Sequence, residues 1–177
     1  GAGHPRGDPA LPRSRSPLLL TAACLAAVLG AAPTALAREY VVDPAGAAAR
    51  DANPGTAGRP LRTVERALEL AKGGDTILLA TGEYPALAIG RTYAEPLTVA
   101  AAPGARPVME AGVSIVRGGG VRLAGLTFTW APDTRPATSP MTPFLQISSA
   151  RDVEVSDCEI FDDPGRTAWV GWACRID

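Results

Sequence analysis

The chain has 177 residues, with 17 basic and 18 acidic side chains, one histidine and a formal net charge of −1 at pH 7. The chain therefore lacks the basic excess of a nucleic-acid-binding protein, and nucleic acid is not an expected partner. The histidine, His4, falls in a segment that we expect to be removed, which argues against serine–histidine and cysteine–histidine nucleophiles in the remainder.

Residues 1–37 have the layout of a secretory signal peptide. Arg13 and Arg15 precede an apolar run from Leu18 to Leu29, and Ala35-Leu36-Ala37 is a small-residue cleavage site. The run is shorter than the roughly 20 apolar residues of a membrane span. We therefore expect a secreted, extracellular protein with no stable membrane span after cleavage.

Residues 38–75 are predicted to form an N-terminal cap. It begins with a short apolar strand at Tyr40 to Val42, which a turn-rich stretch from Asp43 to Pro60 follows. A helix is predicted over residues 63–72, because Thr63 can cap it and Gly73-Gly74 can end it. Its apolar face would cover the open end of the strands that follow, and consists of Val64, Ala67, Leu68 and Ala71.

After the helix, short apolar segments alternate with turn residues. Alternation with period two predicts strands with one buried face at Thr76 to Ala80, Leu87/Ile89, Leu97/Val99 and Val108-Met109. Turns are predicted at Gly82 to Pro85 and at Pro103-Gly104. Gly118-Gly119-Gly120 is not followed by a helix or by Lys-Ser/Thr, so it is interpreted as a flexible corner and not as a phosphate loop.

One segment of the chain repeats with an offset of 32 residues. Its apolar residues Ile115, Val121, Leu123, Leu126 and Phe128 recur as Ile147, Val153, Val155, Cys158 and Ile160. Gly125 and Asp157 interrupt the two copies at matching positions, and both residue types tolerate the positive φ of a tight corner. Stacked copies of such a unit predict a β-solenoid.

The spacing between equivalent strands grows along the chain. We align Ile77 with Leu97, Leu97 with Val121 and Val121 with Val153, at offsets of 20, 24 and 32 residues. Such growth predicts insertions at one corner of the solenoid. Residues 129–143, with four prolines, are predicted to be a loop, and a second loop is predicted to begin at Asp162.

Two cysteines lie outside the signal segment, Cys158 and Cys174. They could form a disulfide in an oxidising compartment. Alternatively, Cys158 is a buried free thiol, because it aligns with the inward-facing Leu126.

A series of motifs follows in order along the chain: Tyr40-Val41-Val42-Asp43-Pro44, Asn53-Pro54-Gly55-Thr56, Pro60-Leu61-Arg62-Thr63-Val64, Ala71-Lys72-Gly73-Gly74-Asp75-Thr76-Ile77, Gly82-Glu83-Tyr84, Pro96-Leu97-Thr98-Val99 and Leu123-Ala124-Gly125-Leu126-Thr127-Phe128. Together they resemble the opening of secreted right-handed parallel β-helix proteins of the pectate-lyase-like superfamily, which includes polysaccharide lyases. The resemblance implies an all-β, right-handed parallel β-helix with an N-terminal amphipathic capping helix. Residues 76–177 would be its first rungs, truncated with the C-terminal part missing, and the full-length protein is expected to be a monomer.

By the same resemblance, a polysaccharide would bind a groove on the sheet that holds Val113 to Val116 and Leu145 to Ser148. The loops 129–143 and 162–175 would wall this groove, and their candidate substrate-binding residues are Trp130, Arg135, Arg166, Trp169 and Trp172. Asp162 and Asp163 are candidate ligands of Ca²⁺, the one cofactor considered. The tryptophans could instead pack locally, and Asp162-Asp163-Pro164-Gly165 could simply be a turn.

The expected activity is a lyase reaction that cleaves a uronate-containing glycan by β-elimination. The one lysine, Lys72, is badly placed at the end of the predicted helix, so catalytic residues are expected beyond Asp177. No organic cofactor is expected. The alternatives are a non-catalytic glycan-binding or structural surface solenoid, and a glycoside hydrolase on the same fold.

Overall fold

The computed structural model describes residues 1, 3, 36–110, 112–129, 143–160 and 174–176. The chain divides into two compact units, residues 1–35 and residues 36–177. Only Gly1 and Gly3 of the first unit are described, so the signal peptide stays a prediction and the following description concerns the second unit.

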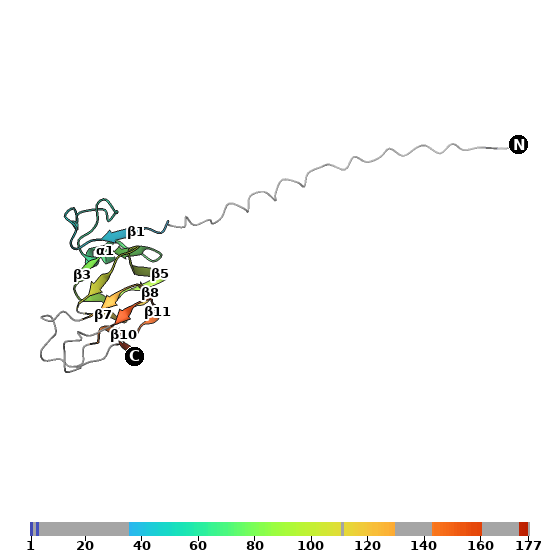
Figure 1. Ribbon diagram of the computed structural model, residues 1–177. Coiled ribbons are helices and arrows are strands. Elements are labelled where there is room, and N and C mark those ends of the chain that lie inside the picture. Colours follow the sequence, from blue (N-terminus) through green and yellow to red (C-terminus); the bar gives the residue numbers. More distant parts are fainter. Residues whose placement is uncertain (2, 4–35, 111, 130–142, 161–173, 177) are drawn as a thin grey trace. The chain divides into compact units, whose positions relative to one another are not determined.

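The described residues of the second unit form three parallel sheets (Figure 1). The first sheet has the order β1 (Glu39–Val42), β2 (Thr76–Leu79), β5 (Thr92–Ala101), β8 (Gly119–Ala124) and β11 (Arg151–Ser156). The second has the order β4 (Leu87–Ile89), β7 (Val113–Val116), β10 (Leu145–Ser148) and β13 (Cys174–Ile176). The third has the order β3 (Gly82–Tyr84), β6 (Pro107–Met109), β9 (Thr127–Phe128) and β12 (Glu159–Ile160).

From β2 onward the chain visits the first, third and second sheets in turn, and then repeats this cycle. Among the described residues, all ten pairings between these strands are parallel. Each cycle is therefore one rung stacked on the preceding rung, which is the parallel β-solenoid that the sequence repeat predicted.

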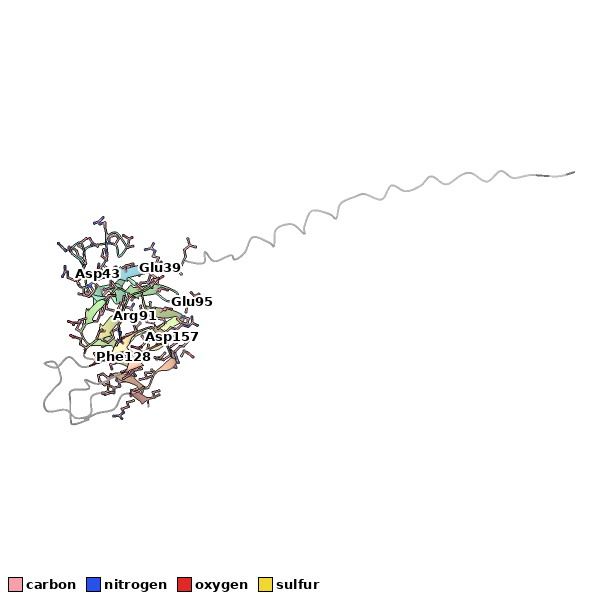
Figure 2. All side chains as sticks on the ribbon, in the orientation of Figure 1. Glu39, Asp43, Arg91, Glu95, Phe128 and Asp157 are labelled. Atoms are coloured by element: carbon pink, nitrogen blue, oxygen red, sulfur yellow. The ribbon has the colours of Figure 1, made fainter. Side chains whose placement is uncertain are left out.

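The 32-residue repeat is confirmed in the pairing register. Ile115 pairs with Ile147, Leu123 with Val155, and Phe128 with Ile160. Gly125 and Asp157 adopt φ angles of 67° and 52°, as predicted for the corner between the first and third sheets (Asp157 is labelled in Figure 2). Short residues that tolerate the left-handed region thus turn both rungs at the same place.

One predicted alignment was wrong. Ile77 pairs with Val99 and not with Leu97, so the offset between these two strands is 22 residues and not 20. Leu97 does pair with Val121, as predicted. The pairing of β5 with β8 is irregular between Thr92 and Leu97, where four residues bulge out of the ladder.

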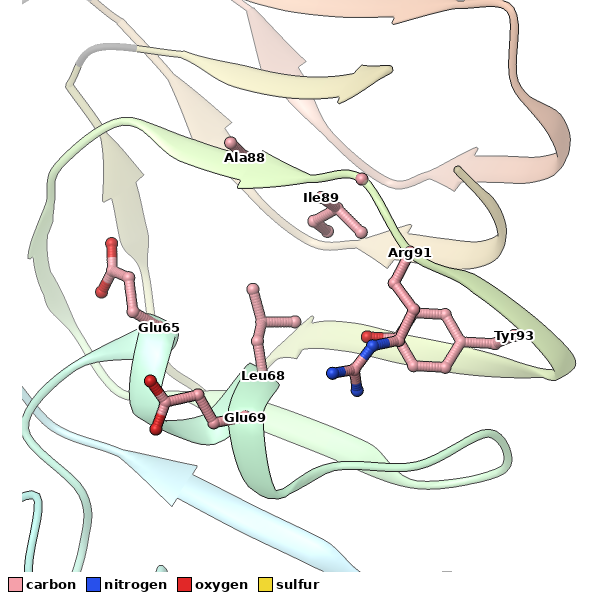
Figure 3. Close-up of a pocket in the computed structure, with 8 residues that line it drawn as sticks. Glu65, Leu68, Glu69, Ala88, Ile89, Arg91 and Tyr93 are labelled. Carbon is pink, nitrogen blue, oxygen red and sulfur yellow. The ribbon is translucent and has the colours of Figure 1, made fainter. Parts of the chain in front are cut away.

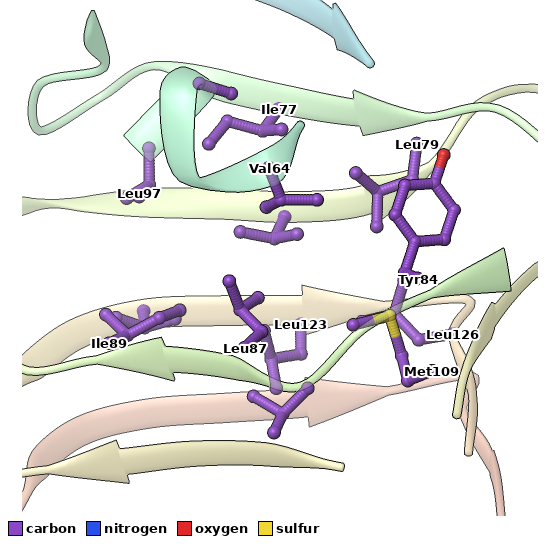
Figure 4. Close-up of a cluster of buried hydrophobic side chains, with 14 of the residues drawn as sticks. Val64, Ile77, Leu79, Tyr84, Leu87, Ile89, Leu97, Met109, Leu123 and Leu126 are labelled. Carbon is purple, nitrogen blue, oxygen red and sulfur yellow. The ribbon is translucent and has the colours of Figure 1, made fainter. Parts of the chain in front are cut away.

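The core lies between the three sheets and includes the inward side chains of β1 to β10, whereas Val155, Ile160 and Ile176 of the last strands are exposed (Figure 4). The predicted turn at Gly82 to Pro85 was wrong for its first three residues, because Gly82–Tyr84 is strand β3 and places the Tyr84 ring in the core. The Tyr84 hydroxyl lies 2.8 Å from the carbonyl oxygen of Ala80 and 3.2 Å from that of Val42. Burial raises the pKa of Tyr84 far above its ordinary value, so the phenol stays neutral and donates.

The helix α1 (Val64–Leu70) is shorter than predicted, because Ala71 already has an extended backbone with ψ 147°. Thr63 caps it as expected, and its hydroxyl accepts a hydrogen bond from the Arg66 amide at 3.3 Å. Asp51 adds a contact that the sequence did not predict: its carboxylate accepts from the amides of Arg62 at 3.0 Å and Thr63 at 2.9 Å. Val64 and Ala67 are buried where α1 packs against β1 and β2.

The glycine run at 118–120 is not a flexible corner. Gly119 and Gly120 are buried residues of β8, and Gly120 has φ 62°. A Cβ at Gly119 would lie 2.5 Å from the carbonyl oxygen of Arg151, and a Cβ at Gly120 would overlap the carbonyl oxygen of Tyr93. Neighbouring rungs approach too closely here for a side chain, so the glycines are required by packing.

Both Cys158 and Cys174 are free thiols. Cys158 packs against the core but is partly exposed, so the expected full burial is not observed. Its Sγ lies 3.2 Å from the carbonyl oxygen of Ser156, and burial raises the pKa of the thiol. The structure therefore supports the unpaired alternative for these two residues.

Candidate functional site

A row of outward side chains crosses the second sheet and forms the face on which the sequence placed the groove. Ala88, Ser114, Gln146 and Arg175 pair in register across β4, β7, β10 and β13, and we call them the outward row. Their neighbours on β4, β7 and β10 point into the core. At the usual spacing of parallel strands the row spans roughly 14 Å, which suits an extended ligand.

The connections that lead into the strands of this row differ greatly in length. Two residues join β3 to β4 and three join β6 to β7, whereas residues 129–144 join β9 to β10 and residues 161–173 join β12 to β13. All four connections run from the third sheet to the second, so the two largest insertions fall at one corner, as predicted. The strands of the outward row therefore begin at this corner.

The predicted site residues within these two connections lie outside the described residues. They are Trp130, Arg135, Asp162, Asp163, Arg166, Trp169 and Trp172. Their roles in binding substrate and Ca²⁺ stay predictions. Within the described ranges, no group of three His, Cys, Asp or Glu side chains could hold a metal ion.

A cavity of about 280 Å³ adjoins the outward row, between α1 and the edge strand of the second sheet (Figure 3). Ala88 belongs to both, so the cavity lies where the outward row reaches β4. Leu68 and Ile89 contribute its apolar surface. The remaining side chains with polar groups are Glu65, Glu69, Arg91 and Tyr93.

Local structure explains how these polar groups come together. Glu65 and Glu69 are four residues apart on α1 and therefore share a helix face. Arg91 and Tyr93 lie at the corner where β4 leads into β5, and the guanidinium carbon of Arg91 is 5.8 Å from the centre of the Tyr93 ring. Arg91 also donates to the carbonyl oxygen of Ala71 at 3.5 Å, which ties this corner to the end of the helix.

Tyr93 is 7% exposed. Burial raises the pKa of Tyr93 and the Arg91 guanidinium partly lowers it, so the phenol is neutral near pH 7. Sequence reasoning did not single out Arg91 or Tyr93. The available signal was the stretch from Thr92 to Pro96, which interrupts the alternation of buried residues just before Leu97.

Glu110 is a second residue that the sequence did not indicate. It follows β6 at the corner that carries the long connections in later rungs. Burial raises the pKa of the Glu110 carboxyl, and the nearby Glu83 carboxylate raises it further. A carboxyl group in such a setting holds its proton more strongly and is suited to donate it.

A further cavity, of about 400 Å³, lies on the other side of the bulge in β5. Its lining includes Tyr93 and the ion pair between Arg122 Nε and Glu154 Oε2, at 3.0 Å. The two charges satisfy each other at exposed positions. This cavity opens on the first sheet and not on the outward row.

Comparisons with known proteins give two matches. A family model described as "Protein of unknown function (DUF1565)" matches residues 47–103, which hold α1 and β2 to β5. A solved structure named "Rhamnogalacturonan lyase" aligns with a TM-score of 0.49 and 11% identity, over 79% of this chain and 62% of that chain. This chain thus spans less than two thirds of that protein. No curated protein matches.

None of the described residues forms a helix of the length and apolarity that crossing a membrane requires.

Proposed function

We propose that this chain belongs to a secreted, polysaccharide-active β-solenoid protein that binds an acidic glycan along the outward row and cleaves it by β-elimination. The observation that carries the proposal is the outward row itself. It runs across four parallel strands, it bears hydroxyl, amide and guanidinium groups, and two of its strands follow the long connections 129–144 and 161–173. Secretion rests on the signal-peptide pattern of residues 1–37.

The row is chemically suited to a uronate polymer. Stacked parallel strands present side chains at regular steps of about 4.8 Å, so a chain of sugar rings can meet one group after another. Arg175 is exposed at the end of the row, and a guanidinium pairs with a carboxylate through two parallel hydrogen bonds. Arg135 and Arg166 of the two connections are proposed to add further positive charge.

In the proposed reaction, neutralising the uronate carboxylate makes the adjacent C5 proton more acidic. A base removes this proton, its bonding electrons form the C4–C5 double bond, and the C4–O bond breaks. The departing oxygen takes a proton from an acid. We propose Glu110 as this acid, because it lies at the corner where β6 of the third sheet leads to β7 of the second and because the pKa of its carboxyl is raised.

Glycoside hydrolysis is the second candidate function. The observation that favours it is the electrostatic coupling of Glu110 to Glu83, since hydrolases commonly use two carboxyl groups of which one is kept protonated. In that reaction water replaces the leaving sugar and no double bond forms.

The experiment is an assay of the whole chain on pectate, alginate and chondroitin, with and without Ca²⁺. A lyase produces the absorbance of an unsaturated uronate, whereas a hydrolase produces reducing ends without it. Arg175→Gln is expected to reduce the activity at least about tenfold. The matched control Arg122→Gln, an outward arginine of the first sheet, is expected to leave it unchanged. Absence of unsaturated product on all three glycans would contradict the lyase proposal.

A further inference from the structure

The cavity between α1 and β4 has an arrangement of groups that the elimination reaction does not use. The two carboxylates of α1 lie on one side, the Arg91 guanidinium and the Tyr93 ring on the other, and Leu68 and Ile89 between them (Figure 3). The cavity therefore combines an apolar surface with hydrogen-bond acceptors on one wall and donors on the other. Mostly apolar pockets with a few convergent polar groups are typical small-molecule sites.

The formal charges around the cavity are balanced. Glu69 is paired with Arg66, whose Nη1 lies 2.6 Å from Glu69 Oε2. Glu65 has no hydrogen-bond or ion-pair partner within the described part of the chain, and Arg91 faces it from the opposite wall. The site thus has no net charge that would compensate an added carboxylate for its lost hydration, because such a group would meet Glu65 as well as Arg91.

A ligand that fits these walls must both donate and accept hydrogen bonds and must bring an apolar face. Hydroxyl groups do both: they donate to the Glu65 carboxylate and accept from the Arg91 guanidinium. A sugar ring carries such hydroxyls around its edge and C–H groups on its faces. The apolar faces can pack on Leu68, which is only partly buried and lines the cavity.

We infer that this cavity is a binding site for a neutral sugar ring, placed at the β4 end of the outward row. This inference rests on the proposed function in one respect, because the sugar would be part of the glycan that the outward row binds. Ala88 connects the two surfaces, since it lines the cavity and begins the row. A glycan on the row would therefore be held by a neutral residue at one end and by its uronates elsewhere.

The test is an NMR titration of the whole chain with two probes that differ only at C6, methyl β-glucopyranoside and the corresponding methyl glucuronoside. The neutral probe is expected to shift the amide signals of Leu68, Ala88 and Gly90 in a saturable way. It is expected to bind at least about threefold more tightly than the uronate probe, because the latter brings a carboxylate beside Glu65. Glu65→Gln is expected to reduce this difference between the probes.

The matched pair of variants is Ala88→Leu and Ala100→Leu. Both alanines stand beside inward residues of their strands, but Ala100 belongs to β5 of the first sheet and does not line the cavity. Ala88→Leu is expected to weaken binding of the neutral probe at least about tenfold by filling the cavity, and Ala100→Leu to leave it unchanged. Absence of saturable shifts, tighter binding of the uronate probe, or equal losses in the two variants would each overturn the inference.

The outcomes separate this inference from the proposed function. Elimination activity without binding of the neutral probe would contradict the inference alone. Binding of the neutral probe, without activity on any uronate glycan, would contradict the lyase proposal alone.

Discussion

The substitution Gly120→Ala tests whether adjacent rungs meet as closely as the structure shows. Gly120 has φ 62°, which costs a residue with a Cβ about 1–2 kcal/mol. Its new methyl group would overlap the carbonyl oxygen of Tyr93, which is backbone and cannot swing away as a side chain can. Forcing an extra group into a well-packed core commonly costs about 1–3 kcal/mol more.

The combined cost is therefore about 2–5 kcal/mol, compared with a total stability of about 5–15 kcal/mol for a typical domain. Gly90→Ala is the matched control, because it makes the same chemical change at the corner of the preceding rung. A Cβ at Gly90 would have as its nearest neighbour the carbonyl oxygen of Val116 at 3.7 Å, an ordinary contact. There the substitution is expected to be neutral, or stabilising by up to about 1 kcal/mol through the unfolded chain.

Chemical denaturation of the wild type and both variants measures these differences in the free energy of unfolding. We expect a clear fall in the denaturation midpoint for Gly120→Ala and none for Gly90→Ala. If both variants changed stability equally, or if Gly120→Ala were as stable as the wild type, the close approach of β8 to the Tyr93 corner would be wrong.

Three further substitutions test other parts of the account. Leu126→Asp places an unpaired charge at a 1% exposed position and is expected to prevent folding. Arg122→Ala removes an exposed ion pair and is expected to lower the free energy of unfolding by less than about 1 kcal/mol. Equal melting temperatures of the two variants would contradict the inward position of Leu126 and the outward position of Arg122. Asp51→Ala leaves the amides at the start of α1 without their acceptor and is expected to lower the free energy of unfolding by about 1–3 kcal/mol in thermal or chemical denaturation. Asp51→Asn is expected to lose less, because its side-chain oxygen can still accept. No change in Asp51→Ala would show that water replaces the carboxylate. Because the pKa of Glu110 is raised in the folded state, protonation of its carboxyl stabilises the fold; this stabilisation is present below the unfolded pKa and is lost as pH rises through the folded pKa. Glu110→Gln is therefore expected to flatten the fall in the free energy of unfolding between mildly acidic and neutral pH. An unchanged slope of the denaturation midpoint against pH would refute this.

Much of the fold could be predicted from the sequence because a solenoid repeats its pattern. The alternation around Val121 and Val153 identifies inward residues, and Gly125 and Asp157 mark the same corner in both rungs. The error at β2 has a physical cause. Leu97 and Val99 both face inward, and a shift of two residues keeps every side chain on its face, so the pattern alone cannot choose between them.

The candidate site was predictable only in part. The period-two alternation of side chains along a strand places Ser114 and Gln146 outward, because each stands between two inward apolar residues. The cavity beside them was not predictable, since it depends on how α1 packs near β4 and on the bulge that positions Tyr93. The glycine run was misinterpreted for a similar reason: a close approach of two rungs leaves no trace in a single sequence except the glycines themselves.

The central claim is that an acidic glycan binds along the outward row. The most direct measurement is an NMR titration of the whole chain with a short uronate oligosaccharide, which reports the amide shift of each residue. The account predicts saturable shifts at Ser114, Gln146 and Arg175 on the second sheet. Shifts confined to Thr98 and Arg122, which face outward on the first sheet, or no saturable shift with any uronate oligosaccharide, would contradict it.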